Sequence, residues 1–235
     1  MTEKQNKVVA ILQPNYIPWK GYFDMIRTAD ELILLDDVQY THDWRNRNRI
    51  KTRDGIKWIT IPVHVKSLQS RINEVTIAGN GWKRKHLNSF VHNYARTKWF
   101  GENYDWLKSL LLDHDDNSLN VINYRFIKAI AAKLGIHTPI SFSSDYNVNG
   151  TKAQKVLNLC RHSQATVYLS GPSAKVYLDE ELFNRAGISV SWMDYIGYPE
   201  YRQLFPPFDH HVSILDLILN EGPEAPEYMK TFMTV

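Results

Sequence analysis

Short apolar runs separated by a polar turn open the chain. Residues 7–13 (KVVAILQ) and 31–35 (ELILL) have the length and character of buried parallel strands, and turn or charged residues bound each run. Between the two runs, apolar side chains recur at helical spacing, at Tyr22, Phe23, Ile26 and Ala29. The pattern therefore predicts a strand, a polar turn, a helix and a second strand.

The middle of the chain mixes both periodicities. Residues 57–65 (KWITIPVHV) are typical of a strand, and Pro62 within them favours an edge position or a bulge. Residues 71–78 (RINEVTIA) predict a further strand, paired near the first. Two helices are expected next, a basic and aromatic one over 82–100 and an apolar one over 118–134.

Strands and helices alternate again toward the end of the chain. The expected strands are 137–143, 166–171 and 188–193. The expected helices are 174–186, 212–220 and one from Thr151, whose hydroxyl can cap it, and residues 197–211 form a loop rich in proline and aromatic residues. This alternation predicts a mostly parallel sheet with right-handed crossovers, in one α/β domain over 1–235 with a helical insertion over 80–134.

Composition adds bounds to this picture. The 235 residues are 43% hydrophobic and 12% aromatic, which is enough for a substantial ordered core. A net charge of +3 does not by itself indicate nucleic-acid binding. The single cysteine excludes an intrachain disulfide, and Cys160 falls at helical spacing among core positions. The first residues lack the apolar stretch of a signal peptide, so we expect a cytoplasmic protein without membrane insertion.

The turn QPNYIPWKGY (13–22) follows the first strand. Ligands of parallel α/β sheets gather at the carboxyl ends of strands, where turns lead into helices. Amide side chains can hydrogen-bond a ligand, aromatic rings can stack on it, and glycine allows close backbone approach. The candidate contacts are Gln13, Asn15, Tyr16, Trp19 and Gly21. The alternative is a structural turn with packed aromatic side chains.

A second candidate segment follows the second strand (35–55, LDDVQYTHDWRNRNRIKTRDG). Asp36 and Asp37 stand where strand-end carboxylates meet a sugar hydroxyl, an amine or a metal. Cations then alternate with other residues, at Arg45, Arg47, Arg49, Lys51 and Arg53, and in an extended segment all five share one face. Such a face suits phosphate or diphosphate, although a charged edge strand that resists aggregation is an equal alternative. Further polar candidates in the segment are Gln39, Tyr40, His42 and Asn46.

The third segment is TVYLSGPSAKVYLD (166–179). Ser170, Gly171, Ser173 and Lys175 follow a strand and can offer hydroxyls, backbone N–H groups and a cation to an anion. The spacing is not that of a Walker loop, and an ordinary helix cap is the alternative. Nine histidines occur without a zinc-binding spacing, so no metal is expected.

Five blocks of the sequence resemble the WbqC-like family and span nearly the whole chain. They are LQPNYIPWKGYFD, LDDVQYTHDWRNRN, YLSGPSAKVYLD, YPEYRQLFPPF and SILDLILNEGPE. The resemblance implies a role in O-antigen or other surface-polysaccharide synthesis, in pathways that use nucleotide-linked amino sugars.

The first turn is also similar in layout to nucleotidyltransferases with a HIGH signature, which implies a Rossmann-like (HUP-type) sheet. The corresponding residues here are Trp19, Lys20, Gly21 and Tyr22. Glycine is kept and both histidines are replaced. Because those histidines stabilise phosphate charge in the transition state, adenylyl transfer is in doubt.

These observations lead to an amide-forming transferase that places an acyl or aminoacyl group, such as glycyl, on the amine of a nucleotide-linked amino sugar. Asp36 or Asp37 would position or deprotonate the amine, with His42 as the rival base. The row that begins with Arg45, Arg47 and Arg49 would hold phosphates, Ser170–Ser173 and Lys175 would bind the remaining phosphate, and Tyr16, Trp19 and Tyr40 would stack on base or sugar. No cofactor is identified, and the donor could be carried by an acyl carrier, carried by tRNA or activated by ATP. The alternatives are an ATP-dependent carboxylate ligase and a non-catalytic nucleotide-sugar-binding module.

Overall fold

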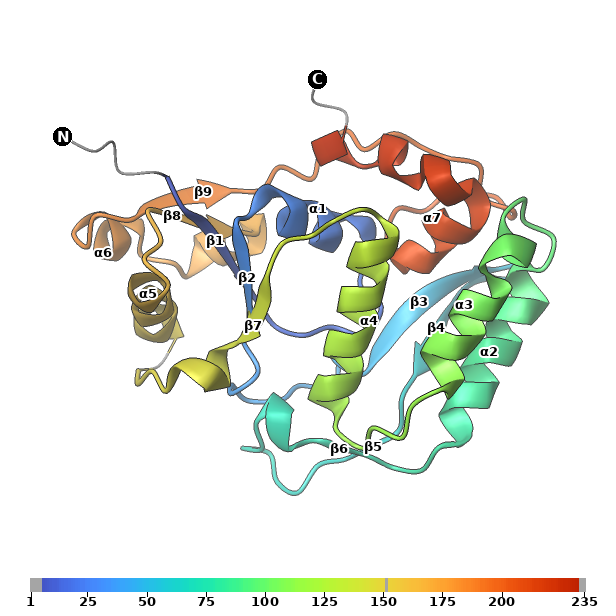
Figure 1. The fold of residues 1–235 in the computed structure, drawn as a ribbon, viewed down its shortest axis with the longest axis horizontal. Coiled ribbons are helices and arrows are strands. Elements are labelled where there is room, and N and C mark those ends of the chain that lie inside the picture. The colour runs from blue at the N-terminus through green and yellow to red at the C-terminus, as the bar shows by residue number, and fades with distance from the viewer. Residues whose placement is uncertain (1–5, 151, 233–235) are drawn as a thin grey trace.

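The computed structural model describes residues 6–150 and 152–232. Its centre is a five-stranded parallel sheet in the order β7-β2-β1-β8-β9 (Figure 1). The strands are β1 (Val8–Leu12), β2 (Glu31–Leu34), β7 (Ile140–Phe142), β8 (Val167–Ser170) and β9 (Ser189–Trp192). A parallel sheet flanked by helices confirms the predicted Rossmann-like α/β fold.

The chain changes direction once as it builds this sheet. It runs from β1 through α1 (Lys20–Thr28) to β2 and then outward to β7. From β7 it returns through α5 (Lys152–His162) to β8, on the other side of β1, and continues through α6 (Glu180–Asn184) to β9. The order therefore reverses between β1 and β8. In open α/β sheets the crevice outside the carboxyl ends at such a point is the usual ligand site.

A large segment is inserted between β2 and β7. It contains the antiparallel hairpin of β3 (Arg47–Thr52) and β4 (Gly55–Thr60), the short pair β5 (Val63–His64) and β6 (Thr76–Ile77), and the helices α2 (Gly81–Tyr94), α3 (Phe100–Leu112) and α4 (Leu119–Lys133). In Figure 1 these elements lie to the right of the sheet. Helix α2 crosses the buried face of the hairpin: the Tyr94 hydroxyl accepts from the Lys51 backbone N–H at 2.9 Å, and His86 Nε2 lies 3.2 Å from the Thr60 carbonyl oxygen.

Both faces of the sheet are covered. Ala10 of β1 belongs to the larger core cluster, which also contains residues of the inserted helices such as Phe90. Val9 belongs to a second cluster beneath α5 and α6, together with Cys160. The alternation along β1 follows from the two-residue period of a strand. Cys160 is fully buried, and burial raises the pKa of its thiol to about 12.

Several boundaries differ from the predicted ones. The strand predicted over 57–65 is interrupted near Pro62, which has no N–H to donate to a ladder, and continues as β5. The helix predicted over 82–100 ends at Tyr94, because the Thr97 backbone N–H and hydroxyl both donate to the Tyr94 carbonyl, at 2.9 and 2.8 Å. Helix α3 follows, and the sequence pattern did not predict it.

The segment after β8 also differs. Instead of one helix over 174–186 there is a 3-10 helix, η3 (Pro172–Val176), and then α6. The side chain of Asp179 accepts from the Glu181 and Leu182 N–H groups and begins α6 as an N-cap. Thr151, the expected cap of α5, lies outside the described residues.

The remaining elements close the fold. They are η1 (Ile72–Glu74), η2 (Ser143–Tyr146), α7 (Ile214–Glu221), η4 (Gly222–Tyr228) and η5 (Lys230–Phe232). The strand predicted over 71–78 is thus η1 followed by the short β6. None of the helices in the described part of the chain combines the length and the apolar character that a membrane crossing needs.

Candidate functional site

The turn between β1 and α1 is fixed by side-chain amides from distant elements. The Asn48 amide of β3 donates to the carbonyl oxygens of Tyr16 and Ile17, at 3.0 and 2.8 Å. The Asn123 amide of α4 donates to the Pro14 carbonyl at 3.0 Å. These bonds satisfy backbone acceptors that the turn itself leaves unpaired.

Ile17 carries backbone strain in this turn. Its φ of 36° lies in the left-handed region, which a β-branched residue rarely adopts, and its side chain is fully buried. Such a conformation costs roughly 1–3 kcal/mol and persists only where the surroundings enforce it. Here the enforcing groups include the Asn48 amide and the buried contacts of the Ile17 side chain.

A pocket of about 210 Å³ opens beside this turn. Its lining consists of Asn15, Pro18, Trp19, Trp44, Asn48 and His211. Asn15 Oδ1 is buried and has no hydrogen-bond partner among the described residues. An unpaired buried acceptor costs free energy, so a ligand that donates a hydrogen bond to it gains binding energy.

Trp19 is held over the first turn of α1. Its ring lies 5.0 Å from the Tyr195 ring and is stacked on His211 at 6.2 Å with an interplanar angle of 24°. A Cβ atom on Gly171 would lie 3.8 Å from the Tyr195 hydroxyl. The loop after β8, which belongs to the third candidate segment, therefore lies next to Tyr195, whose ring also contacts Trp19 of the first turn.

The cation row divides in the structure. The guanidinium groups of Arg47 and Arg49 lie over the Trp58 ring, at 4.6 and 4.8 Å, and Arg49 also lies 5.1 Å from the Trp44 ring. Lys51 is buried, and its ammonium donates to the Pro207 carbonyl. Two cations of the strand thus form a layered surface with two indoles next to the pocket.

Arg45 lies in the turn before β3, and Arg53 lies beyond the strand. The Arg45 guanidinium donates to Asp43 at 2.6 Å and to the side-chain oxygen of Gln13. The Tyr22 hydroxyl donates to the Gln13 carbonyl at 3.1 Å. Segments 13–22 and 35–55 therefore meet through the contact between Gln13 and Arg45.

Other candidates of the second segment have local partners. The Tyr40 hydroxyl lies 3.2 Å from His42 Nδ1, and burial raises the pKa of Tyr40 to about 12. The His42 ring is exposed. Gln39 donates to the Leu68 carbonyl at 2.7 Å, and the buried Asn46 amide donates to a backbone carbonyl of the chain after β4.

Asp36 has a structural environment. It is 1% exposed, and its carboxylate accepts from the Asn120 amide at 2.9 Å, from the Ser143 hydroxyl at 3.0 Å, and from the N–H and hydroxyl of Ser144 at 3.0 and 2.8 Å. The Asn73 amide is a further neighbour at 3.4 Å. A carboxylate with these partners joins the ends of β2 and β7 and has little capacity left for a ligand.

Asp37 is the more available carboxylate. It forms an ion pair with Lys155 of α5 and accepts from the Ser143 hydroxyl at 2.5 Å, and the side chains of Asp37 and Lys155 are 13% and 10% exposed. Burial acts to raise the pKa of Asp37. The Lys155 and Ser143 hydrogen bonds and the Lys155 charge outweigh burial, so the pKa lies below its ordinary value. Asp37 is therefore a permanent anion at neutral pH.

The third segment has a less defined geometry. Ser170 is 3% exposed and its hydroxyl donates to the Tyr168 hydroxyl at 3.3 Å. Ser173 and Lys175 are exposed on η3, with the Lys175 ammonium 5.4 Å from the Trp192 ring.

Tyr16, a candidate of the first segment, is fully buried and packs in the core, where its hydroxyl lies 2.9 Å from His86 Nδ1.

The sequence did not single out several residues of this site, namely Trp44, Lys155, Ser143, Tyr195 and His211. Trp44 alone had a local signal, because it begins the cation row. Lys20 is a further surprise: it is 3% exposed, its ammonium donates to the Pro199 carbonyl at 3.1 Å, and burial lowers its pKa to about 8. Within the described ranges, no three His, Cys, Asp or Glu side chains are grouped as a metal ion requires.

Comparisons with known proteins agree with the five sequence blocks. A sequence model of the WbqC-like protein family matches residues 13–228, a range that contains the whole candidate site. The uncharacterized protein Rv1507c of Mycobacterium tuberculosis (strain ATCC 25618 / H37Rv) is 47% identical over 226 residues, which are 95% of this chain and 98% of that protein. No solved structure matches the chain at a significant level.

Proposed function

The chain belongs to the WbqC-like protein family, and we propose that it transfers an acyl or aminoacyl group to the amine of a nucleotide-linked amino sugar. Family membership supports a role in polysaccharide synthesis. The main support for a nucleotide-linked substrate is the pocket lined by Trp19 and Trp44, in which Asn15 Oδ1 is buried without a hydrogen-bond partner in the described structure. A flat ring that donates a hydrogen bond, such as a nucleobase, matches this combination of walls and acceptor.

The surroundings of the pocket suit the rest of a nucleotide sugar. Arg47 and Arg49 lie over Trp58, and Arg49 also reaches Trp44, which lines the pocket. Guanidinium groups bind diphosphate oxygens in a bidentate manner. A base held between Trp19 and Trp44 would place its diphosphate along this layered surface.

Asp37 supplies the charge that an amine requires. Its depressed pKa suits it to orient an ammonium group and makes it a poor acceptor of that group's proton. His42, with an exposed ring next to the Tyr40 hydroxyl, takes the role of base in this proposal. The free amine then attacks the carbonyl carbon of the donor, the bond from that carbon to the donor oxygen or sulfur breaks, and the proton lost by the amine ends on the released donor group.

Two observations favour a second candidate, a nucleotide-sugar-binding module without catalysis. Asp37 is already paired with Lys155, and the first turn carries Trp19 and Tyr22 where the similar nucleotidyltransferases carry histidines. Both candidates predict the same ligand, and only the transferase predicts turnover.

The test combines binding and mass spectrometry. The purified protein is incubated with nucleotide-linked amino sugars and with acyl-carrier, aminoacyl-tRNA and ATP-activated donors, and the products are examined for the added acyl mass. An added mass on the amine supports the transferase. Saturable binding of the nucleotide sugar without any product over the whole donor panel supports the binding module. Absence of binding contradicts both.

A further inference from the structure

We propose that the outer face of α2 and the β3–β4 hairpin form a binding surface for single-stranded RNA, which presents the aminoacylated 3′ end of a tRNA to the pocket. The inference rests on the proposed function, because it names tRNA as the carrier of the donor group. We define this surface, the α2–hairpin surface, by Lys57, Trp58, Arg84, Lys85 and His92, which are all exposed.

Charge is distributed very unevenly along the chain. Residues 44–60 and 80–100 contain eleven of the 28 Lys and Arg residues and only one of the 25 Asp and Glu residues. These two segments therefore carry a net charge of +10, and the rest of the chain carries −7. The modest net charge of the whole protein conceals a strongly basic region, which is the electrostatic signature of a polyanion site.

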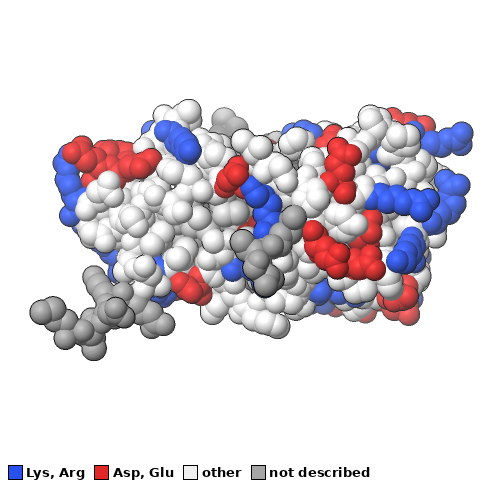
Figure 2. Space-filling view, turned by 90° about the horizontal axis from the view of Figure 1, so that it is seen from above, with Lys and Arg blue, Asp and Glu red and all other residues white. Residues whose placement is uncertain are grey.

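These cations are mostly not neutralised within the protein. Among the eleven, Arg45 and Lys57 are the ones that pair with a carboxylate in the described part of the chain, with Asp43 and Asp54. Figure 2 shows several Lys and Arg side chains at the end of the molecule that carries α2 and α3, at right, with acidic side chains beside them, and both kinds of charge also at the opposite end. Lys and Arg side chains without a carboxylate partner can neutralise the phosphates of a nucleic acid, and the counterions that this releases favour binding.

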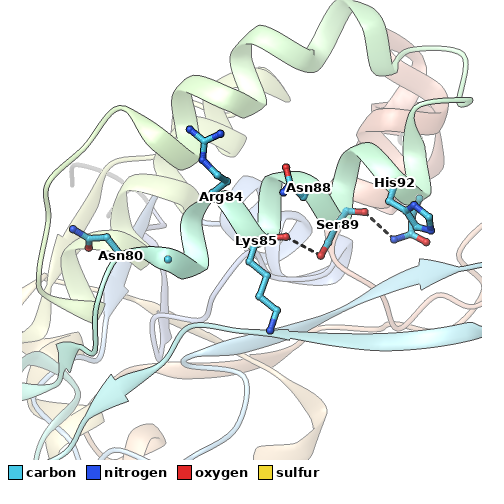
Figure 3. A pocket seen from close by; sticks show the side chains of 8 residues that line it. Asn80, Arg84, Lys85, Asn88, Ser89 and His92 are labelled. Carbon is cyan, nitrogen blue, oxygen red and sulfur yellow. Dashed lines mark hydrogen bonds between the residues drawn. The ribbon is translucent and has the colours of Figure 1, made fainter.

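The outer face of α2 is hollowed. A shallow depression of about 680 Å³ is lined by Asn80, Gly81, Arg84, Lys85, Asn88, Ser89, His92 and Asn93. In Figure 3, Lys85 points toward the strands drawn beneath the helix and Arg84 points away from them. The lining offers amide, hydroxyl and cationic donors and contains no carboxylate. Such groups donate hydrogen bonds to the phosphates and riboses of nucleic acids.

Helix α2, whose outer face bears this depression, packs against the hairpin. His86 Nε2 of this helix lies 3.2 Å from the Thr60 carbonyl oxygen at one end of β4. In the described residues β4 pairs with β3 and with no other strand. Trp58 is 42% exposed and pairs with Arg49 on the face of the hairpin opposite the one that packs against α2, so an RNA strand that contacts Arg84, Lys85 and Trp58 would pass around the edge of β4.

Aromatic and guanidinium groups then lead from β4 to the pocket. Trp58 lies 5.0 Å from Trp44, which lines the pocket, so an RNA base stacked on Trp58 would stand beside the Arg49 guanidinium that holds the diphosphate of the nucleotide sugar. Alternating cations and stacking platforms are how proteins hold single strands without reading their sequence. An acidic carrier protein could use the cations, but it has no need of an exposed indole between them, and this favours RNA.

The chemistry of such a donor balances. The sugar amine attacks the ester carbonyl carbon of the aminoacyl group, the ester carbon–oxygen bond breaks, and the proton lost by the amine ends on the released ribose hydroxyl. No oxidant, reductant or further reactant is needed.

Fluorescence anisotropy with labelled, uncharged tRNA tests the surface. We expect binding that weakens at least about tenfold between roughly 50 and 200 mM salt, as several phosphate contacts require. Arg84→Glu/Lys85→Glu should raise Kd at least about tenfold. The matched control Arg161→Glu/Arg185→Glu, which changes net charge equally on exposed residues of α5 and next to α6, should stay within about twofold. Trp58→Ala should weaken tRNA binding about tenfold, and affect a blunt RNA hairpin less.

Further outcomes distinguish failure of the RNA-binding surface from failure of the proposed transferase function. Equal losses in both charge variants, or no binding of tRNA, overturn the surface. Binding of an acidic acyl carrier protein that depends on Arg84 and Lys85, with no binding of tRNA, assigns it to a protein partner instead. Dependence of tRNA binding on these residues with no transfer product leaves the surface in place and removes the proposed function. Transfer from a donor other than RNA, with no binding of tRNA, would support the proposed function and overturn the RNA surface.

Discussion

A Cβ atom on Gly21 would stand 2.4 Å from Cζ2 of the Trp19 ring, closer than two carbon atoms can approach. The indole therefore occupies the space over the first turn of α1 that any other residue at position 21 would fill. The pocket wall formed by Trp19 depends on this glycine.

Gly21→Ala should displace the Trp19 ring and weaken nucleotide-sugar binding about tenfold, because a stacking wall is worth roughly 1–1.5 kcal/mol. Isothermal titration calorimetry measures the loss. Gly101→Ala in α3 is the control: its Cβ would meet nothing within 4 Å, so binding should not change and stability should rise by up to about 1 kcal/mol. Equal affinity of Gly21→Ala and wild type would show that Trp19 is not a wall of the ligand site.

The opening unit could be predicted because its signals are local. Apolar runs of strand length on either side of a helical repeat specify β1, α1 and β2 without any distant contact. The same logic fails for α3, since a helix of that kind is decided by packing against α2 and α7. Boundaries fail where one side chain competes for the backbone, as Thr97 does at the end of α2.

The candidate site shows the same division. Gln13, Asn15 and Trp19 could be singled out because they follow a strand. The roles of Asp36 and Asp37 could not be separated by sequence, because the difference lies in partners more than one hundred residues away. Ser143 and Ser144 saturate Asp36, and Lys155 pairs with Asp37.

Asn15 provides the most direct test of the pocket. Its side-chain oxygen has no partner in the described structure, so Asn15→Ala removes no hydrogen bond from that atom. We expect nucleotide-sugar affinity to fall about tenfold, the value of one hydrogen bond to a buried partner, and the free energy of unfolding to change by less than about 0.5 kcal/mol. Calorimetry and urea denaturation measure the two quantities. A large loss of stability with unchanged affinity would assign Asn15 a purely structural role.

Asn48 should behave in the opposite way. Its amide donates to the Tyr16 and Ile17 carbonyls, and these bonds hold Ile17 at positive φ. Asn48→Ala leaves two buried carbonyls unpaired and should lower the free energy of unfolding by about 2–4 kcal/mol, as urea denaturation would report. Asn88→Ala on the exposed face of α2 is the control and should change it by less than about 0.5 kcal/mol. A small effect of Asn48→Ala would mean that the turn keeps its conformation without the amide.

His86 should make stability depend on pH. Burial lowers its pKa from 6.5 to about 4, and the neutral ring can accept from the Tyr16 hydroxyl at Nδ1 while Nε2–H donates to the Thr60 carbonyl. Between these pH values the unfolded chain binds the proton and the folded chain does not. Stability therefore falls as pH drops from about 6.5 to about 4, by about 3 kcal/mol in total, and this contribution is constant above that range.

Urea denaturation at several pH values measures this slope. His86→Gln should flatten it, whereas His137→Gln, at an exposed position, should leave it as in wild type. Since burial also lowers the pKa of His114 and His210, the informative quantity is the difference between each variant and wild type. Parallel slopes for wild type and His86→Gln would contradict the assignment.

Asp36 and Asp37 are adjacent, yet the same substitution should separate their roles. Asp36→Asn would turn an NH₂ group toward N–H and O–H groups that now donate to the carboxylate. The lost hydrogen bonds should lower the free energy of unfolding by about 3 kcal/mol or more. Asp37→Asn keeps an acceptor for Ser143 and leaves Lys155 unpaired, which should cost about 1–2 kcal/mol. Thermal and urea denaturation compare the two.

In the proposed site, Asp37 should select an amine over a neutral group. An ionised carboxylate attracts an ammonium group by its charge as well as by hydrogen bonding, whereas a hydroxyl at the same position can only donate a hydrogen bond. Wild type should therefore bind a nucleotide-linked amino sugar more tightly than its hydroxyl analogue, and Asp37→Asn should reduce that ratio about tenfold while binding the hydroxyl analogue as wild type does. Calorimetry with both ligands measures the ratio. Because each variant is compared with itself, a general loss of stability cancels, and an unchanged ratio would remove Asp37 from the amine site.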